Sequence, residues 1–143
     1  METTEKTTIT IQARINAPVS KVWKCWTTPE DIVKWNNASD DWYTPFARND
    51  LRIGGKFLSR MEARDGSSGF DFGGVYTDLQ TNKLIEYKID DGRQVIITFS
   101  ESDNKTEVVE TFEAETTNSI ELQRTGWQSI LNNFKKYAES DKH

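Results

Sequence analysis

A long run of short alternating segments, separated by turn residues, constrains the fold of this chain more than any other feature. Clusters of Asp, Asn, Gly, Ser and Thr interrupt the run at 65–68, 81–82, 90–92 and 102–104. Residues of these types favour the tight turns that join antiparallel strands. The sequence therefore predicts six strands that follow one another as hairpins, over residues 42–48, 55–64, 70–79, 84–89, 94–100 and 106–114.

The N-terminal part predicts one more strand and two short helices. Apolar and polar residues alternate over 8–15, which is the period of a strand with one buried face. Pro18 then begins a segment with apolar residues at helical spacing, and Thr28 followed by Pro29 gives a second helix start. Glycine pairs at 54–55 and 73–74 indicate bulges or bends, so we expect a strongly curved sheet of six or seven strands.

The C-terminal part predicts one long helix. Asn118 or Ser119 can cap it, and apolar residues recur at steps of three and four from Trp127 to Ala138. Its apolar stripe is expected to cover the concave face of the sheet. The fold class is thus α+β, and we expect a single domain over 1–143 with its core at about 8–138.

Composition excludes several classes of function. The net charge of −5 would repel a nucleic-acid backbone. His143 and Cys25 are the single residues of their types, so zinc sites and nucleophiles that use a histidine base are excluded, and Cys25 is expected in the core. We expect no metal ion and no cofactor. The polar start of the chain and the lack of a stretch of ~20 apolar residues predict a cytoplasmic protein with no integral membrane association.

Four short motifs resemble one family. They are the segment 15–23 continued by 26–30 and Trp35, the segments 50–55 and 74–79, and the pair Gly126–Trp127. Together they are similar to proteins related to the C-terminal domain of the activator of the heat-shock-protein-90 ATPase, over about residues 8–137. This family belongs to the START-like (SRPBCC) superfamily, whose helix-grip fold wraps a curved sheet around a long helix.

The resemblance implies a hydrophobic ligand cavity, since the superfamily includes lipid-transfer domains, polyketide cyclases and aromatases. Inward-facing positions of the predicted strands and helix are the candidate lining, although the same residues could simply fill the core. The candidates are Phe57, Met61, Phe70, Phe72, Tyr76, Val95, Ile97, Phe99, Val108, Glu110, Phe112, Trp127, Ile130, Leu131 and Phe134.

Four aromatic residues lie close together between the predicted helices and the sheet. Trp35, Trp42, Tyr43 and Phe46 are candidates for the pocket mouth, where they could form a mobile lid that closes over a ligand. The alternative is ordinary packing of a loop against the core.

Glu110 is the charged residue that strand alternation places inward, between Val108 and Phe112. A buried carboxylate needs a partner, and the candidates are Arg52, Arg60 or a ligand hydroxyl. Glu110 could then orient a ligand or act as a general base. A bulge that turns it to solvent is the alternative.

The function expected from these features is non-catalytic binding of a small, mostly apolar molecule, such as a lipid, polyketide or polyphenol-like compound. One alternative is a stress-response protein that acts through a chaperone partner. A second is an enzyme of the cyclase or aromatase type, which would need several acid–base groups in the pocket.

Overall fold

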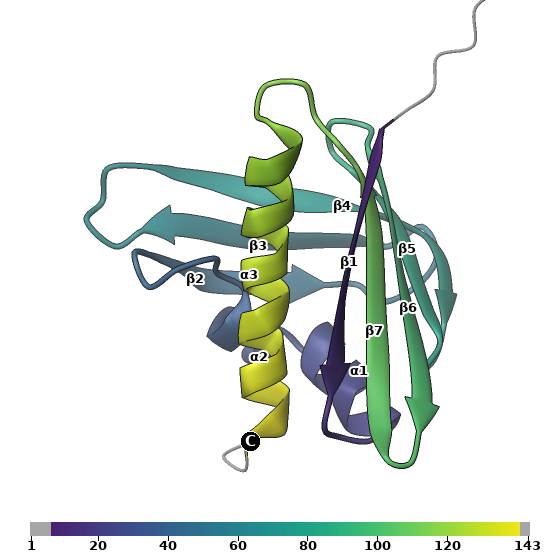
Figure 1. Ribbon diagram of the computed structural model, residues 1–143. Coiled ribbons are helices and arrows are strands. Elements are labelled where there is room, and N and C mark those ends of the chain that lie inside the picture. Colours follow the sequence, from purple (N-terminus) through teal and green to yellow (C-terminus); the bar gives the residue numbers. More distant parts are fainter. Residues whose placement is uncertain (1–6, 141–143) are drawn as a thin grey trace, which may run out of the picture.

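The computed structural model describes residues 7–140 and shows one seven-stranded sheet with three helices (Figure 1). Every pair of neighbouring strands is antiparallel, and the strand order is β1-β7-β6-β5-β4-β3-β2. The strands are β1 (Thr8–Ile15), β2 (Trp42–Asn49), β3 (Lys56–Ala63), β4 (Gly69–Gln80), β5 (Leu84–Ile89), β6 (Gln94–Ser102) and β7 (Lys105–Glu113). The helices are α1 (Val19–Thr27), α2 (Pro29–Trp35) and α3 (Ile120–Glu139).

The predicted fold class is confirmed, since a curved antiparallel sheet grips a long C-terminal helix and two short helices follow the first strand. Strands β2 to β7 form a meander, because each pairs with the next along the chain. β1 joins this meander at its far end, beside β7. The helix-grip arrangement therefore places the first and last predicted strands next to each other.

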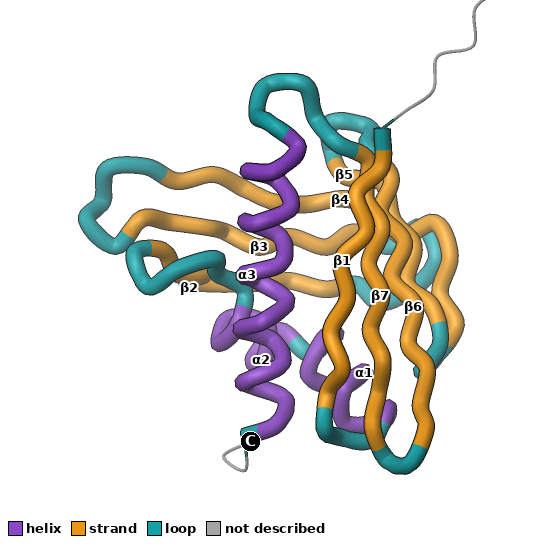
Figure 2. Tube along the Cα trace, viewed as in Figure 1, coloured by secondary structure: helices purple, strands orange, loops and turns teal. Residues whose placement is uncertain are grey.

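The sheet bends so strongly that its two halves run in different directions. In Figures 1 and 2, β1, β7 and β6 run nearly along α3, whereas β2, β3 and β4 cross behind it. Gly74 of β4 lies where the backbones of two neighbouring strands come very close. A Cβ atom there would be 2.3 Å from the carbonyl oxygen of Lys88, so only glycine fits. The predicted bend at this glycine is therefore a close approach of the backbone.

Local sequence sets the helix ends. Pro29 occupies the first turn of α2, where its missing N–H costs no hydrogen bond. Ser119 caps α3, and its side chain accepts a hydrogen bond from the backbone N–H of Leu122 at 3.0 Å. Of the two predicted caps, Ser119 is the one that the structure uses. No helix within residues 7–140 is long and apolar enough to cross a membrane.

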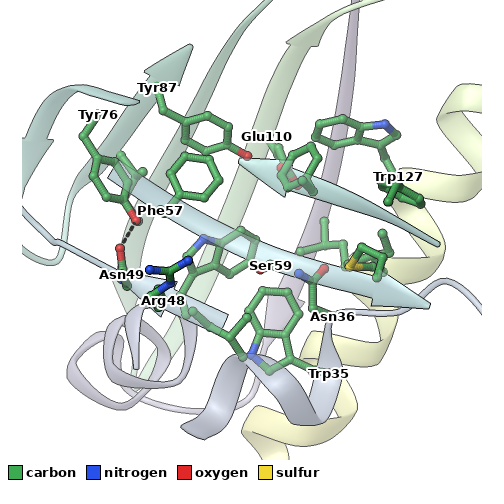
Figure 3. A pocket seen from close by; sticks show the side chains of 18 of the residues that line it. Trp35, Asn36, Arg48, Asn49, Phe57, Ser59, Tyr76, Tyr87, Glu110 and Trp127 are labelled. Carbon is green, nitrogen blue, oxygen red and sulfur yellow. Dashed lines mark hydrogen bonds between the residues drawn. The ribbon is translucent and has the colours of Figure 1, made fainter. Parts of the chain in front are cut away.

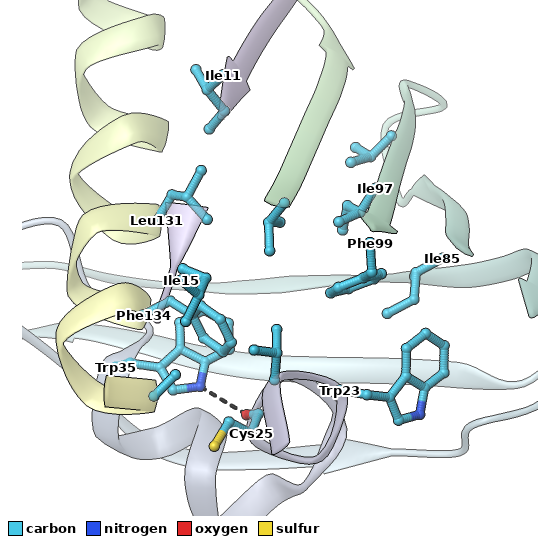
Figure 4. Packing of buried hydrophobic residues seen from close by; sticks show 14 of the residues in the cluster. Ile11, Ile15, Trp23, Cys25, Trp35, Ile85, Ile97, Phe99, Leu131 and Phe134 are labelled. Atoms are coloured by element: carbon cyan, nitrogen blue, oxygen red, sulfur yellow. Dashed lines mark hydrogen bonds between the residues drawn. The ribbon is translucent and has the colours of Figure 1, made fainter. Parts of the chain in front are cut away.

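Aromatic side chains fill the core where α1, α2 and the C-terminal half of α3 meet the sheet (Figure 4). The ring of Phe134 lies 4.7 Å from Trp26 and 4.9 Å from Trp35, measured between ring centroids. The indole N–H of Trp35 donates to the carbonyl oxygen of Cys25 at 3.0 Å. Cys25 is fully buried, as predicted. These contacts leave this end of the concave face closed.

Candidate ligand-binding site

The other part of the concave face encloses a cavity of about 290 Å³ (Figure 3). Strands β2 to β5 form its floor, α3 covers it, and α1 and α2 close one side. Most of its wall is apolar, which suits a ligand that leaves water on binding. The lining residues are Trp26, Ile32, Trp35, Asn36, Arg48, Asn49, Phe57, Ser59, Met61, Phe70, Phe72, Tyr76, Ile85, Tyr87, Arg93, Glu110, Trp127, Ile130 and Leu131.

Aromatic rings hold the shape of the cavity. Phe57 lies between two tyrosines, with centroids 5.2 Å from Tyr76 and 4.6 Å from Tyr87. On the helix side, Trp127 stacks on Phe112 at 3.9 Å with an angle of 11° between the rings. Such ring pairs are worth ~0.5–1.5 kcal/mol beyond simple burial. These ring contacts therefore hold the cavity wall in place.

Glu110 lies on the cavity wall and is only 6% exposed. Its neighbours across the sheet are Ile11 on β1 and Ile97 on β6, both buried. Its carboxyl group has no hydrogen-bond or ion-pair partner among the described residues. Burial therefore raises the pKa of Glu110 to about 8, because the apolar surroundings penalise the charged form.

Tyr87 is the second buried polar group on this wall. It is 7% exposed, and its hydroxyl points toward Glu110 (Figure 3). Burial and then the charge of Glu110 raise the pKa of Tyr87 well above 10. No described residue accepts a hydrogen bond from this hydroxyl. Tyr87 and Glu110 thus both present free polar atoms to the cavity.

Tyr76 differs, because its hydroxyl donates to Oδ1 of Asn49 at 2.5 Å. This bond connects β4 with the end of β2 across β3. Burial raises the pKa of Tyr76 well above its usual value of 10, and the bond to Asn49 opposes this only in part. Tyr76 is therefore a neutral wall residue whose hydroxyl is already occupied.

The arginines proposed as partners of Glu110 lie elsewhere. Arg52 pairs with Asp50 at 3.0 Å, and both are exposed. Arg60 pairs with Glu62 at 3.0 Å and with Asp71 at 3.3 Å. Neither arginine contacts Glu110, so the predicted ion pair is absent between these described residues. The alternative in which a bulge exposes Glu110 is also wrong, since β7 keeps its register with β1 and β6 there.

Two other arginines reach the cavity. Arg48 is exposed at the end of β2. Arg93 follows the turn between β5 and β6, where its Nε donates to Asp91 at 2.9 Å and its Nη1 to the carbonyl oxygen of Glu113 at 3.3 Å. Within residues 7–140, no group of three His, Cys, Asp or Glu side chains is placed to hold a metal ion.

Comparison with known proteins places this chain in a family. A family model described as "Activator of Hsp90 ATPase homolog 1-like protein" matches residues 16–139. The chain belongs to this family. A search among curated proteins finds no match.

Solved structures agree with this membership. An AHSA1-like protein from Aeromonas hydrophila is 42% identical, with a TM-score of 0.88 over 96% of this chain and 98% of that chain. A protein from Cytophaga hutchinsonii is 52% identical, with a TM-score of 0.80 over 92% of this chain and 91% of that chain. A protein from Nitrosomonas europaea, 19% identical, shares the fold with a TM-score of 0.80 over 94% and 96% of the two chains.

In this AHSA1-like protein, the predicted lining residues fall into two groups. One group lines the cavity, and the other belongs to the hydrophobic core. Along the cavity are Phe57, Met61, Phe70, Phe72, Tyr76, Glu110, Trp127, Ile130 and Leu131. In the core, away from the cavity, are Val95, Ile97, Phe99, Val108, Phe112 and Phe134.

The four aromatics predicted at the mouth do not act together. Trp35 lines the cavity but is 5% exposed and fixed by its bond to Cys25. Trp42, Tyr43 and Phe46 lie on β2 and do not line the cavity. Phe46 is 44% exposed under the guanidinium of Arg48. These three residues belong to an edge strand with a bulge between Tyr43 and Phe46, not to a loop over the cavity, so the predicted lid does not form from them.

Sequence reasoning missed several residues that line the cavity. Tyr87 is the most informative of them, since it alternates with Ile85 and Ile89 on β5 and all three are buried. This alternation was visible in the sequence and could have identified Tyr87. No such pattern marks Arg93, because a turn rather than a strand positions it. The other missed residues are Trp26, Ile32, Asn36, Arg48, Asn49, Ser59 and Ile85.

Proposed function

We propose that this protein binds a small, mostly apolar molecule in the cavity between the sheet and α3, without catalysing a reaction. The observation that carries the proposal is the cavity of about 290 Å³ with its aromatic and aliphatic wall. This volume is at the lower end of the range for small-molecule sites, which is ~300–1,000 Å³. A lipid chain, a polyketide or a polyphenol-like compound of modest size fits that space.

The membership in the AHSA1-like family supports a second candidate, which is contact with a chaperone. The specific observation in its favour is the loop between β2 and β3, where Leu51 is 40% and Ile53 is 60% exposed. Exposed apolar residues of this kind can serve as contact points for a protein partner. The two functions use different surfaces, so one experiment can separate them.

The test begins with a search for apolar molecules retained by the purified protein. Two-dimensional NMR spectra are then recorded with lipids, polyphenols and polyketides, and separately with a heat-shock-protein-90 chaperone. Cavity binding predicts shifts at Phe57, Tyr87 and Trp127. Shifts confined to 51–53 on addition of the chaperone would instead support the second candidate.

A substitution that fills the cavity provides the control. Ser59 is 5% exposed and lines the cavity, so Ser59→Leu places an apolar side chain in the ligand's space. Ser100→Leu is the matched change at an exposed position of β6. We expect Ser59→Leu to abolish binding and Ser100→Leu to preserve it. Equal binding by both variants would contradict the cavity as the site.

A further inference from the structure

Two polar groups on the cavity wall converge although they come from strands that are not neighbours. Tyr87 on β5 pairs with Val95 on β6, and Val95 pairs with Phe112 on β7. Glu110 is therefore two residues along β7 from the position opposite Tyr87, and two strand spacings of ~4.8 Å separate the backbones. A tyrosine side chain spans much of that distance, and Figure 3 shows its hydroxyl directed toward Glu110.

Both groups have unused hydrogen-bonding capacity that faces the cavity. Within residues 7–140, Asp31 Oδ2 is the one completely inaccessible side-chain oxygen or nitrogen without a hydrogen-bond partner. The side-chain oxygens of Tyr87 and Glu110 have no partner either, so they are not completely inaccessible. Because both residues line the cavity, we infer that these oxygens are reached from it. A buried polar group without a partner costs ~1–3 kcal/mol, which a ligand that bonds to it recovers.

The protonation states decide which kind of ligand atom fits. With its pKa raised to about 8, Glu110 carries a proton at pH 7, and Tyr87 also stays neutral. A carboxylic acid held neutral by an apolar site donates a hydrogen bond, as a tyrosine hydroxyl does. Two donors that converge on one point suit an acceptor oxygen with two lone pairs.

The other titratable groups that line the cavity do not change the protonation states of Glu110 and Tyr87. Tyr76 on β4 is bonded to Asn49, Arg93 is bonded to Asp91, and Arg48 is exposed at the end of β2. The lining residues from β3 and α3, and the neighbours on β1 and β6, have no titratable side chain. Burial is the cause of the raised pKa of Glu110, so no arginine offsets it.

We propose that the cavity recognises the carbonyl oxygen of a mostly apolar ligand, which accepts one hydrogen bond from the hydroxyl of Tyr87 and one from the carboxyl group of Glu110. This inference rests on the proposed function and adds a chemical class to it, namely uncharged ketones, enones or similar carbonyl compounds. A ligand hydroxyl would place a third donor at the same point. Of the two arginines that line the cavity, Arg93 is bonded to Asp91 and Arg48 is exposed at the end of β2, so an anion beside Tyr87 and Glu110 would have no unpaired buried cation.

Three naphthalene compounds of nearly equal shape test the inference. They are 2-acetylnaphthalene, 2-isopropenylnaphthalene, in which a methylene group replaces the carbonyl oxygen, and 1-(2-naphthyl)ethanol. Their affinities are measured at pH 6.5 by calorimetry. Two neutral hydrogen bonds predict that the ketone binds about tenfold or more tightly than the alkene. The carbonyl carbon of ¹³C-labelled ketone should also shift downfield in the bound state.

Variants assign the effect to the two residues. Glu110→Gln keeps a donor through its amide and should preserve the preference for the ketone, whereas Tyr87→Phe should reduce it about threefold to tenfold. Tyr43→Phe is the matched control, because the hydroxyl of Tyr43 lies outside the cavity and donates to Glu62 at 3.3 Å. It should leave the preference unchanged.

The outcomes separate this inference from the proposed function. Equal affinity for ketone and alkene, or tighter binding of the alcohol, overturns the carbonyl assignment while the cavity function stands. A preference that survives Tyr87→Phe undiminished also overturns it. Failure of all three compounds to bind contradicts the cavity function itself.

Discussion

Ionisation of Glu110 is expected to make the folded protein less stable as the pH rises from acidic to alkaline. The carboxyl group is buried among Ile11, Ile97 and the cavity wall, with no cation beside it. Its pKa is about 8 in the folded protein, against an ordinary value of 4.5 in the unfolded chain. Between these two values the folded state holds a proton that the unfolded state has released.

The sign of the pH dependence follows from this difference in bound protons. Where the unfolded state binds fewer protons, the free energy of unfolding falls as the pH rises. The contribution of Glu110 is therefore fully present below about pH 4.5, and it is lost progressively until about pH 8. Since a difference of one in pKa corresponds to ~1.4 kcal/mol, the full loss is about 5 kcal/mol as an upper limit.

The assay is urea denaturation followed by tryptophan fluorescence at pH values from 4 to 9. Glu110→Gln keeps the shape of the side chain and removes the charge, so its stability should lack this pH dependence. From the acidic to the alkaline end of this range, the free energy of unfolding of the natural chain should fall by ~3–5 kcal/mol relative to that of Glu110→Gln.

Glu107→Gln provides the matched control on the same strand, because Glu107 is exposed and points away from the cavity. Its free energy of unfolding should change with pH in the same way as that of the natural chain. The same pH dependence in Glu110→Gln would refute the burial argument. A ¹³C-detected titration of Glu110 with its midpoint near pH 4.5 would also refute it.

Three further predictions concern packing and mobility. Phe134→Ala should lower the free energy of unfolding by ~3–5 kcal/mol in denaturant titrations, since the ring is fully buried. Phe72→Ala should lower it by less, because this ring faces the cavity. Equal losses would contradict the boundary between core and cavity. Ser119→Ala should cost ~1 kcal/mol, and no loss would mean that the cap of α3 contributes nothing. The indole N–H of Trp35 should exchange slowly with solvent even without ligand, and exchange that is fast until ligand binds would support the predicted lid.

The sequence predicted the order and type of the elements well because both depend on local patterns. The alternation in 8–15 and the turn clusters between the strands each specify structure over fewer than a dozen residues. The predicted strands at 8–15 and 84–89 coincide with β1 and β5, and the others differ from the structure by one or two residues at their ends. Ser119 gave the start of α3 through an equally local contact with Leu122.

The extent of the cavity could not be predicted in the same way, because alternation identifies the inward face but not what covers it. Phe99 and Phe72 both point inward. Phe99 is met by Trp23 and Trp26 from α1, whereas Phe72 is met only in part by Trp127. Whether an inward residue lines a space or fills it depends on the position of a helix far away in sequence. For the same reason, the absence of a partner for Glu110 became visible only in three dimensions.

The pairing of β1 with β7 has a consequence for how the chain folds. Thr10 and Thr111 face each other across this pair with their Oγ1 atoms 3.0 Å apart, although 101 positions separate them in sequence. During synthesis, β1 must wait until β7 has been made, and α3 then packs against β1. The cavity, which α3 covers, is therefore completed last. A molecule that contacts both the sheet and α3 can be held only after α3 has packed, so its binding would stabilise the completed fold.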